Sequence, residues 1–163
     1  MLAVSDTSPI SNLASIGHLH LIKSQFSKVC ISDAVMKELM AHPDLAARET
    51  IQQALRDQWI QIGVTRDSTI LRVLLLQIHR GEAESIALAI DLNADVVLMD
   101  EQEGRRLATK AGLVVTGVLG IHLRAKRMGE IAALKPAIHL LRTKAGFFIA
   151  PSLEAMVVTA AGE

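Results

Sequence analysis

Short runs of consecutive apolar residues alternate along the chain with longer segments whose apolar residues recur every three or four positions. The apolar runs have the length of strands and lie at 1–4, 28–32, around Ile60, 94–100 and 113–117. A run that is apolar at every position is typical of a strand buried on both faces of a sheet. The alternation of such runs with helical periodicity therefore predicts an α/β fold with a central parallel sheet wrapped by helices.

The segments between these runs predict the helices. Apolar spacing, capping residues and glycine stops place helices within 8–17, 18–26, 34–42, 43–59, 66–79, 80–93, 101–112, 118–129 and 130–146. Pro136 is expected to break or kink the last of them. No repeat or long linker divides the chain, so a single domain over residues 1–163 is expected. The apolar tail from about residue 149 is expected to pack on this domain or on a partner.

The composition of the chain limits which classes of partner and of location are expected. Seventeen basic and seventeen acidic residues give a net charge of zero, so any anionic partner needs a local patch or a metal ion. With three Phe, one Trp and no Tyr, an aromatic platform for single-stranded nucleic acid is not expected. No apolar stretch reaches the ~18 residues of a membrane span, and no signal peptide is recognisable. A cytoplasmic protein with no membrane association is expected, and the single Cys30 is expected to be a buried thiol.

Four acidic residues stand out by their positions in the predicted fold. Asp6 and Asp100 each end an apolar strand, and ligands bind outside the carboxyl ends of parallel strands. Glu38 and Glu82 lie on predicted helices that can bring them to the same edge of the sheet. Four carboxylates close together repel one another, so the arrangement favours a hard cation such as Mg²⁺ or Mn²⁺. Such an ion suits the hydrolysis of a phosphodiester.

Each acid also has a structural alternative. Asp6 precedes Thr-Ser-Pro and can cap a helix. Glu38, next to Lys37, is typical of a solvated helix face, and Glu82 lies in a first helical turn, where an acid interacts favourably with the helix dipole. Glu101 and Glu103 are assigned to that dipole role, whereas Asp100 remains open. Lone histidines are more often solvated or at the edge of the core, and none of the six has the spacing of a zinc-binding helix.

The segments "VSDTSPISNLASIGHLHLI" and "GEAESIALAIDLNADVVLMDEQEGRRLATKAGLVVTG" resemble the PIN-domain family, in particular its prokaryotic branch related to toxin–antitoxin ribonucleases. The resemblance runs from about Leu2 to Phe148. It implies a three-layer α/β/α fold and Mg²⁺- or Mn²⁺-dependent cleavage of RNA. It also implies a catalytic and metal-binding set, which matches Asp6, Glu38, Glu82 and Asp100. By the same resemblance, Ser8 is expected to hydrogen-bond a metal-bound water or a phosphate.

The sequence differs from the family pattern at one motif, and the resemblance leaves several functions open. Relatives often carry Asp-Asp-Arg where this chain has Asp100-Glu101-Gln102, which leaves Arg105 and Arg106 as the candidate phosphate contacts. The expected function is a toxin-like ribonuclease with a small antitoxin protein as partner, forming a homodimer. The alternative is a catalytically degenerate PIN-like module for binding or assembly. A phosphatase of the haloacid-dehalogenase type is disfavoured, because it needs a second aspartate where this chain has Ser8.

The "GEAES" segment contains two glutamates, of which one is expected to serve the site. Ala83, Ile86 and Ile90 mark the core-facing stripe of the predicted helix. Glu82 lies almost in line with this stripe at its N-terminal end, whereas Glu84 lies on a flank. Glu82 is therefore expected to face the other acids, and Glu84 to lie at the rim.

Overall fold

Five parallel strands form the central sheet of the computed structural model, which describes residues 1–163. The sheet order is β3-β2-β1-β4-β5. The strands are β1 (Leu2–Ser5), β2 (Lys28–Ile31), β3 (Ile60–Ile62), β4 (Val96–Leu98) and β5 (Val115–Thr116). Each follows an apolar run of the sequence, and every pairing is parallel. The α/β prediction with a central parallel sheet is therefore confirmed.

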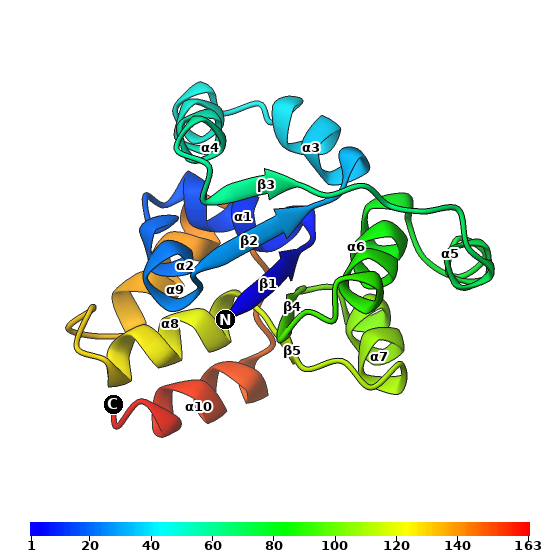
Figure 1. Cartoon of the computed structure of the whole chain (residues 1–163). Helices are drawn as coiled ribbons and strands as arrows, with labels where there is room; N and C mark the ends of the chain where they lie inside the picture. Colours follow the sequence, from blue (N-terminus) through cyan, green and yellow to red (C-terminus); the bar gives the residue numbers. More distant parts are fainter.

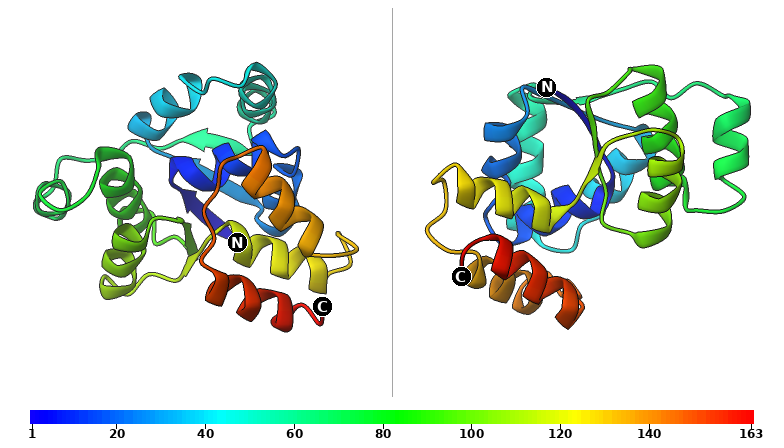
Figure 2. Two further views of the ribbon diagram at one scale, coloured as in Figure 1. Left: turned by 180° about the vertical axis from the view of Figure 1, so that it is seen from behind. Right: turned by 90° about the horizontal axis from the view of Figure 1, so that it is seen from below.

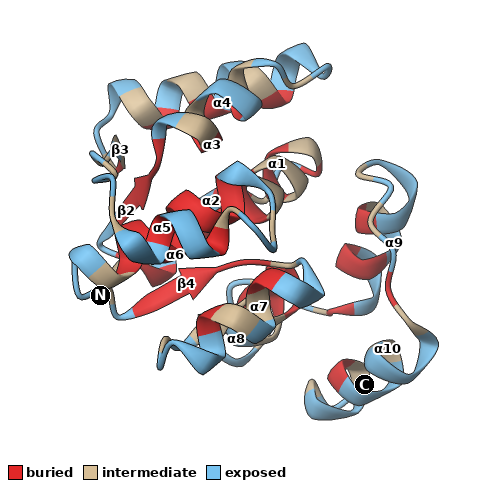
Figure 3. Ribbon diagram, turned by 90° about the vertical axis from the view of Figure 1, so that its right-hand side faces the viewer, coloured by how far each residue is buried: buried red, intermediate tan, exposed pale blue.

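Alternate residues of the strands face two separate cores. In β1, Ala3 packs into one core and Val4 into the other, and in β4 Val97 faces the same side as Val4. The smaller core is covered by α5 (Thr69–Leu74), α6 (Arg80–Asp91) and α7 (Gln102–Lys110). The larger is covered by helices that include α1 (Thr7–Ser15), α2 (His20–Gln25), α4 (Leu45–Arg56) and α8 (Val118–Arg127). Figure 1 shows the two groups on opposite sides of the sheet, and Figure 3 shows their buried inner surfaces.

The order of the strands creates a switch point at the centre of the sheet. From β1 the chain builds outward through β2 and β3, then returns to place β4 on the other side of β1 (Figure 1). The connections that leave β1 and β4 therefore run to opposite sides. In such sheets a crevice forms outside the carboxyl ends of these two strands, and ligands bind there. Between α1 and α6, the helix α3 (Asp33–Met40) contacts both and borders the same region.

The C-terminal part differs from the sequence prediction in two respects: the helix predicted over 130–146 is shorter, and the apolar tail forms a further helix that was not predicted. Pro136 does not kink a long helix but lies in the first turn of α9 (Lys135–Thr143). Proline has no N–H to donate, and the first turn of a helix needs none there. After α9, the last helix α10 (Pro151–Ala160) packs against α8, as Figure 2 shows from two sides. The Glu163 side chain accepts hydrogen bonds from the amides of Leu134 and Lys135, so the tail lies on its own chain.

None of the helices has the length and apolar character needed to cross a membrane.

Candidate active site

Asp6 lies at the switch point, directly after β1. Its amide donates to the carbonyl of Leu98 in β4, with N and O 2.9 Å apart. The residue occupies the N-cap position of α1, but its side chain accepts no capping hydrogen bond. It is 4 % exposed and lines a depression at the carboxyl end of the sheet. The structure therefore does not support helix capping as the role of this carboxyl group.

Glu38 reaches the same depression from α3. The Thr7 hydroxyl donates a short hydrogen bond to its carboxylate, which ties α3 to the first turn of α1. Gly81 makes the close approach of α6 possible. A Cβ atom at Gly81 would lie 2.9 Å from Oε1 of Glu38 and 3.4 Å from Oδ1 of Asp6. The absence of a side chain at this position thus leaves room for both carboxyl groups.

The two glutamates of α6 point to different places. Glu82 lines the depression, and its Oε2 accepts a hydrogen bond of 3.3 Å from the amide of His79. Glu84 instead accepts a hydrogen bond from the amide of Ala34 at the start of α3, and it pairs with Arg80 at 3.2 Å. Glu82 therefore faces the other acids, while Glu84 joins α6 to α3.

Asp100 follows β4 and is held beside the depression rather than inside it. Its Oδ1 accepts a hydrogen bond of 2.9 Å from the amide of Val118, at the start of α8. Its Oδ2 accepts a longer one of 3.3 Å from the hydroxyl of Ser8. A Cβ atom on Gly117 would collide with Oδ1 of Asp100, so glycine is needed here as well. Asp100 lines an adjoining cavity that shares Ser8 with the depression.

The depression, which we call the acidic depression, has a volume of about 360 Å³. Its lining contains no lysine or arginine, and consists of Asp6, Thr7, Ser8, Ser11, Asn12, Glu38, His79, Gly81, Glu82 and Glu101. Three of the four predicted acids line it directly, and the fourth, Asp100, is next to it. Thr7, Asn12 and His79 are polar residues that the sequence did not single out.

The surroundings of Asp6, Glu82 and Asp100 disfavour the ionised form of these carboxyl groups. Burial, which is the main cause, and the nearby acids Glu82, Glu38 and Asp100 together raise the pKa of Asp6 to about 7, although a hydrogen bond from the Thr7 amide offsets part of the shift. Burial likewise raises the pKa of Asp100 to about 6, against the hydrogen bond from Val118. The pKa of Glu82 is raised by burial too. A cation in the depression would reverse these shifts, because opposite charge favours the ionised form.

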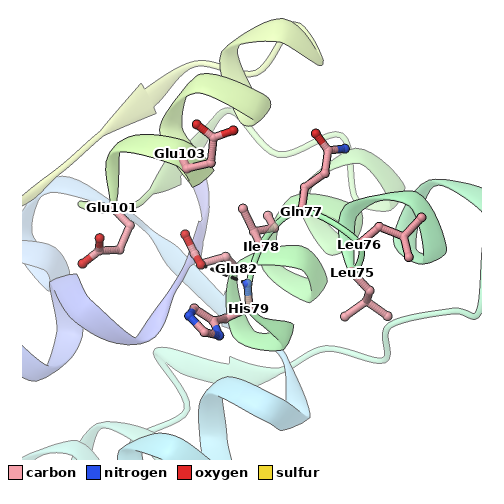
Figure 4. A pocket seen from close by; sticks show the side chains of 8 residues that line it. All are labelled: Leu75, Leu76, Gln77, Ile78, His79, Glu82, Glu101 and Glu103. Carbon is pink, nitrogen blue, oxygen red and sulfur yellow. Dashed lines mark hydrogen bonds between the residues drawn. The ribbon is translucent and has the colours of Figure 1, made fainter.

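Glu101 is the acid whose position the sequence interpretation missed. It is the N-cap residue of α7, yet its side chain makes no capping hydrogen bond and lines the acidic depression. Together with His79 and Glu82 it also lines a larger hollow of about 710 Å³ between α7 and the loop before α6. Figure 4 shows Glu82 and Glu101 close to one another in this hollow, with Glu103 pointing away. The sequence placed Glu101 at a helix start, but its rotation toward the depression depends on how α7 packs.

The two predicted arginines do not reach the acidic depression. Arg106 pairs with Glu103 on the exposed surface of α7. The guanidinium of Arg105 donates a hydrogen bond of 2.7 Å to the carbonyl of Met99 and thereby secures the end of β4. Neither residue lines the depression, but Arg105 lines a neighbouring cavity together with Asp100, so the role of the two arginines as phosphate contacts stays a prediction.

The donor set suits Mg²⁺ or Mn²⁺ in kind, because these ions prefer oxygen ligands. In their present positions the carboxyl groups do not form a set of three or more that could hold a metal ion. Hydrogen bonds hold Glu38, Glu82 and Asp100 apart around the depression. Mg²⁺ retains several waters and is usually bound by only one or two carboxylates, so the spread arrangement is compatible with it.

Comparisons with known proteins identify the family of the chain. A family model described as PIN domain matches residues 2–163. Among solved structures, the chain is similar to a PilT N-terminus domain protein from the hyperthermophilic archaeon Sulfolobus solfataricus P2. The identity is 17 %, the TM-score 0.49, and the match covers 74 % of this chain and 90 % of the other. No curated protein matches the sequence significantly.

Proposed function

Because the chain belongs to the PIN-domain family, whose members are generally nucleases that bind RNA and use divalent metal ions, we propose that it is a metal-dependent ribonuclease. The observation that carries the proposal is the acidic depression at the switch point of the sheet. There, the buried carboxyl groups of Asp6, which follows β1, and Glu82 of α6 lie with the exposed Glu38 of α3 in one depression that no basic residue lines. A cation would stabilise the ionised form of such a cluster.

The residues at the strand ends take the main part in the proposed mechanism. Asp6 and Asp100 would bind Mg²⁺ or Mn²⁺, and Glu38 and Glu82 would hold its waters by hydrogen bonds. A bound divalent cation supplies an activated water and stabilises the charge that develops on the leaving oxygen. The hydroxyl of Ser8, which donates to Asp100, would accept a hydrogen bond from a metal-bound water, or would donate to a phosphate oxygen in place of Asp100. The Thr7 hydroxyl fixes Glu38, and the Val118 amide fixes Asp100.

The finer parts of the proposal rest on the resemblance of the sequence. We place the protein among toxin-like ribonucleases of the cytoplasm, silenced by a small antitoxin protein, and we expect a homodimer of a single-domain chain. Two exposed apolar side chains on α10, Leu153 and Met156, support a self-association surface. Light scattering that gives the mass of one chain at micromolar concentration would rule out the dimer.

A catalytically degenerate binding module is the second candidate. It is favoured by the absence of lysine and arginine from the acidic depression, because phosphate affinity usually draws on these residues. The two candidates differ in their response to metal. The nuclease requires a divalent cation for turnover, whereas the binding module does not turn RNA over under any condition.

Cleavage of single-stranded RNA in millimolar Mg²⁺ or Mn²⁺ and in excess EDTA tests the proposal. We expect cleavage with the cation and none in EDTA. Asp6→Asn and Asp100→Asn should each lower kcat by more than about a hundredfold, corresponding to about 2.7 kcal/mol. Asp67→Asn is the matched control, because Asp67 is an exposed acid that pairs with Arg72 and lines none of these hollows. Cleavage that persists in EDTA would refute the metal mechanism.

A further inference from the structure

The segment between α9 and α10 places an exposed aromatic side chain beside the candidate active site. We propose that Phe148 stacks on one unpaired base of a single-stranded RNA whose backbone enters the acidic depression. This inference rests on the proposed function and names the form of its substrate. It assigns Phe148 as a residue that binds the substrate without taking part in the chemistry.

The conformation of this segment holds Phe148 outward. Gly146, with φ of +63°, turns the chain after α9, and the amide of Phe147 donates to the carbonyl of Leu141 at 2.9 Å. Phe147 is half-buried against the larger core, and Ile149 is only 3 % exposed. Between these two anchored neighbours, Phe148 is 83 % exposed. The backbone at Phe148 is therefore anchored on both sides and presents the ring to solvent, which lowers the backbone entropy that binding must remove.

A cavity of about 460 Å³ joins Phe148 to the acids. Ser8, Asn12, Asp100 and Glu101 line it from one side, and residues 145–148 line it from the other. This volume lies in the range of small-molecule sites. The cavity shares Ser8, Asn12 and Glu101 with the acidic depression. An RNA phosphate at the acids would therefore have its neighbouring base within this cavity.

The chemistry of the lining favours a base over a phosphate. No lysine or arginine lines the cavity, and its two acids repel a phosphate in the absence of a cation. An aromatic face binds any unpaired base by stacking, without need of charge. Phe26 is buried and Trp59 is half-buried, so Phe148 is the one Phe or Trp side chain that is exposed. The low aromatic content argued against a stacking platform, but the one exposed aromatic ring lies beside the candidate active site.

Self-association is the alternative role of Phe148. Leu153 and Met156 on α10 are also exposed and apolar, and Leu153 shares with Phe148 a second cavity that reaches Asp100. A dimer interface centred on α10 would need all three residues. Stacking on RNA needs Phe148 but not Met156, which lines neither cavity. Met156→Ala is therefore a matched control that removes a similar exposed apolar side chain.

The test measures cleavage kinetics and equilibrium binding with a short single-stranded RNA in Mn²⁺. Phe148→Ala should raise KM by roughly tenfold with kcat changed by less than about twofold, because stacking on a base remote from the reacting atoms contributes uniform binding. Phe148→Trp should retain the low KM, Phe148→Leu should not, and Met156→Ala should match the wild type. The slope of log Kd against log salt should stay unchanged in Phe148→Ala, since no charge is removed.

A scan of abasic positions through the RNA identifies the stacked base. In the wild type, removal of one particular base should raise KM and Kd by roughly tenfold, while in Phe148→Ala the same removal should change them by less than about twofold. Equal effects in both proteins, or a Phe148→Ala that binds RNA as the wild type does, would overturn the inference and leave the nuclease proposal standing. Conversion of a dimer to monomers by both Phe148→Ala and Met156→Ala would also overturn the inference about Phe148. If the wild type binds RNA but does not cleave it, the Kd values of the variants alone test this inference. If the wild type neither binds nor cleaves RNA, the inference and the nuclease proposal are both wrong.

Discussion

The fold contains two groups of titratable side chains, a histidine pair that includes His122 of α8 and the acids of the acidic depression, and they are stabilised in different ways. Beyond the first turn of α8, His122 is fully buried. Its Nδ1 lies 2.9 Å from the carbonyl oxygen of Val118, and its Nε2 lies 3.0 Å from Nδ1 of His18. Burial lowers the pKa of His122 to about 4, so the pair is neutral near pH 7. The acidic depression gathers carboxyl groups of which two, those of Asp6 and Glu82, have pKa values raised chiefly by burial.

The histidine pair is complete by itself, whereas the acidic depression is not. Each ring nitrogen of His122 has a partner within the chain, and both rings can satisfy these bonds without charge. In the acidic depression no side chain donates a hydrogen bond to Asp6, and its neighbours carry charge of the same sign. Buried polar groups whose hydrogen bonds are all made within the chain stabilise the fold. A cluster of like charges without partners in the chain is suited to binding a ligand. The comparison therefore assigns a structural role to one group and a binding role to the other.

The largest expected effect separates the two glutamates of α6. Glu82→Gln should lower kcat by more than about a hundredfold with little change in stability, because Glu82 faces the acidic depression. Glu84→Gln should keep most of the activity and instead lower the free energy of unfolding by about 1 kcal/mol, through a weaker contact with Ala34 and Arg80. Kinetics and urea denaturation of both variants measure this. The reverse ranking of activities would contradict the placement of the site.

The next effect concerns the histidine pair. His122→Ala should lower the free energy of unfolding by about 2–4 kcal/mol, because it leaves a cavity and removes the partner of His18. The activity per folded molecule should stay within about twofold of the wild type. His139→Ala, which changes an exposed histidine on α9, is the matched control for stability. If His122→Ala abolishes the metal-dependent activity of protein that is still folded, the two regions are not separate.

A smaller effect is the opposite pH dependence of the two regions in metal-free protein. The pKa of Asp6 is higher in the folded state, about 7, than its ordinary value of 3.8, so its contribution lowers stability as pH rises from about 4 to 7. The pKa of His122 is lower in the folded state, about 4, than its ordinary value of 6.5. Its contribution therefore lowers stability as pH falls from about 6.5 to 4. Each group changes the unfolding free energy by at most about 1.4 kcal/mol per pH unit.

Variants separate these two contributions. In urea denaturation between pH 4 and 7, Asp6→Asn should make stability rise more steeply with pH, because the contribution of His122 remains. His122→Gln should do the reverse. Millimolar Mn²⁺ should remove the loss due to Asp6, since a bound cation keeps the carboxylate ionised. Identical pH profiles in the wild type and both variants would show that neither group titrates differently on folding.

Local patterns in the sequence were sufficient to predict the sheet and the two strand-end acids. Apolar runs of strand length indicate strands that are buried on both faces of the sheet. Asp6 and Asp100 follow β1 and β4, which are neighbours in the sheet, and so lie at the same edge. The orientation of helical residues was harder to predict. Glu101 and Arg106 lie on α7 or at its start, and only the packing of that helix decides that the first lines the depression and the second does not.

Contacts between distant segments could not be predicted from local patterns. Thr7 and Glu38 are joined by a hydrogen bond, yet nothing in the spacing of these residues signals it. The roles of Gly81 and Gly117 are also invisible in the sequence, because they depend on which carboxyl group each helix end approaches. Phe148 likewise lies in a connection between helices, and only the fold brings it to the cavity beside Asp100.

The binding of Mn²⁺ at equilibrium, followed by the electron paramagnetic resonance signal of the free ion, tests the central claim most directly. The claim is that the acidic depression is a site for a divalent cation. We expect the wild type to bind Mn²⁺ at neutral pH, with Asp6→Asn and Asp100→Asn each weakening the affinity by more than about tenfold. Asp67→Asn should bind as the wild type does. A wild type that binds no Mn²⁺ at millimolar concentration, or an Asp6→Asn variant with unchanged affinity, would contradict the account.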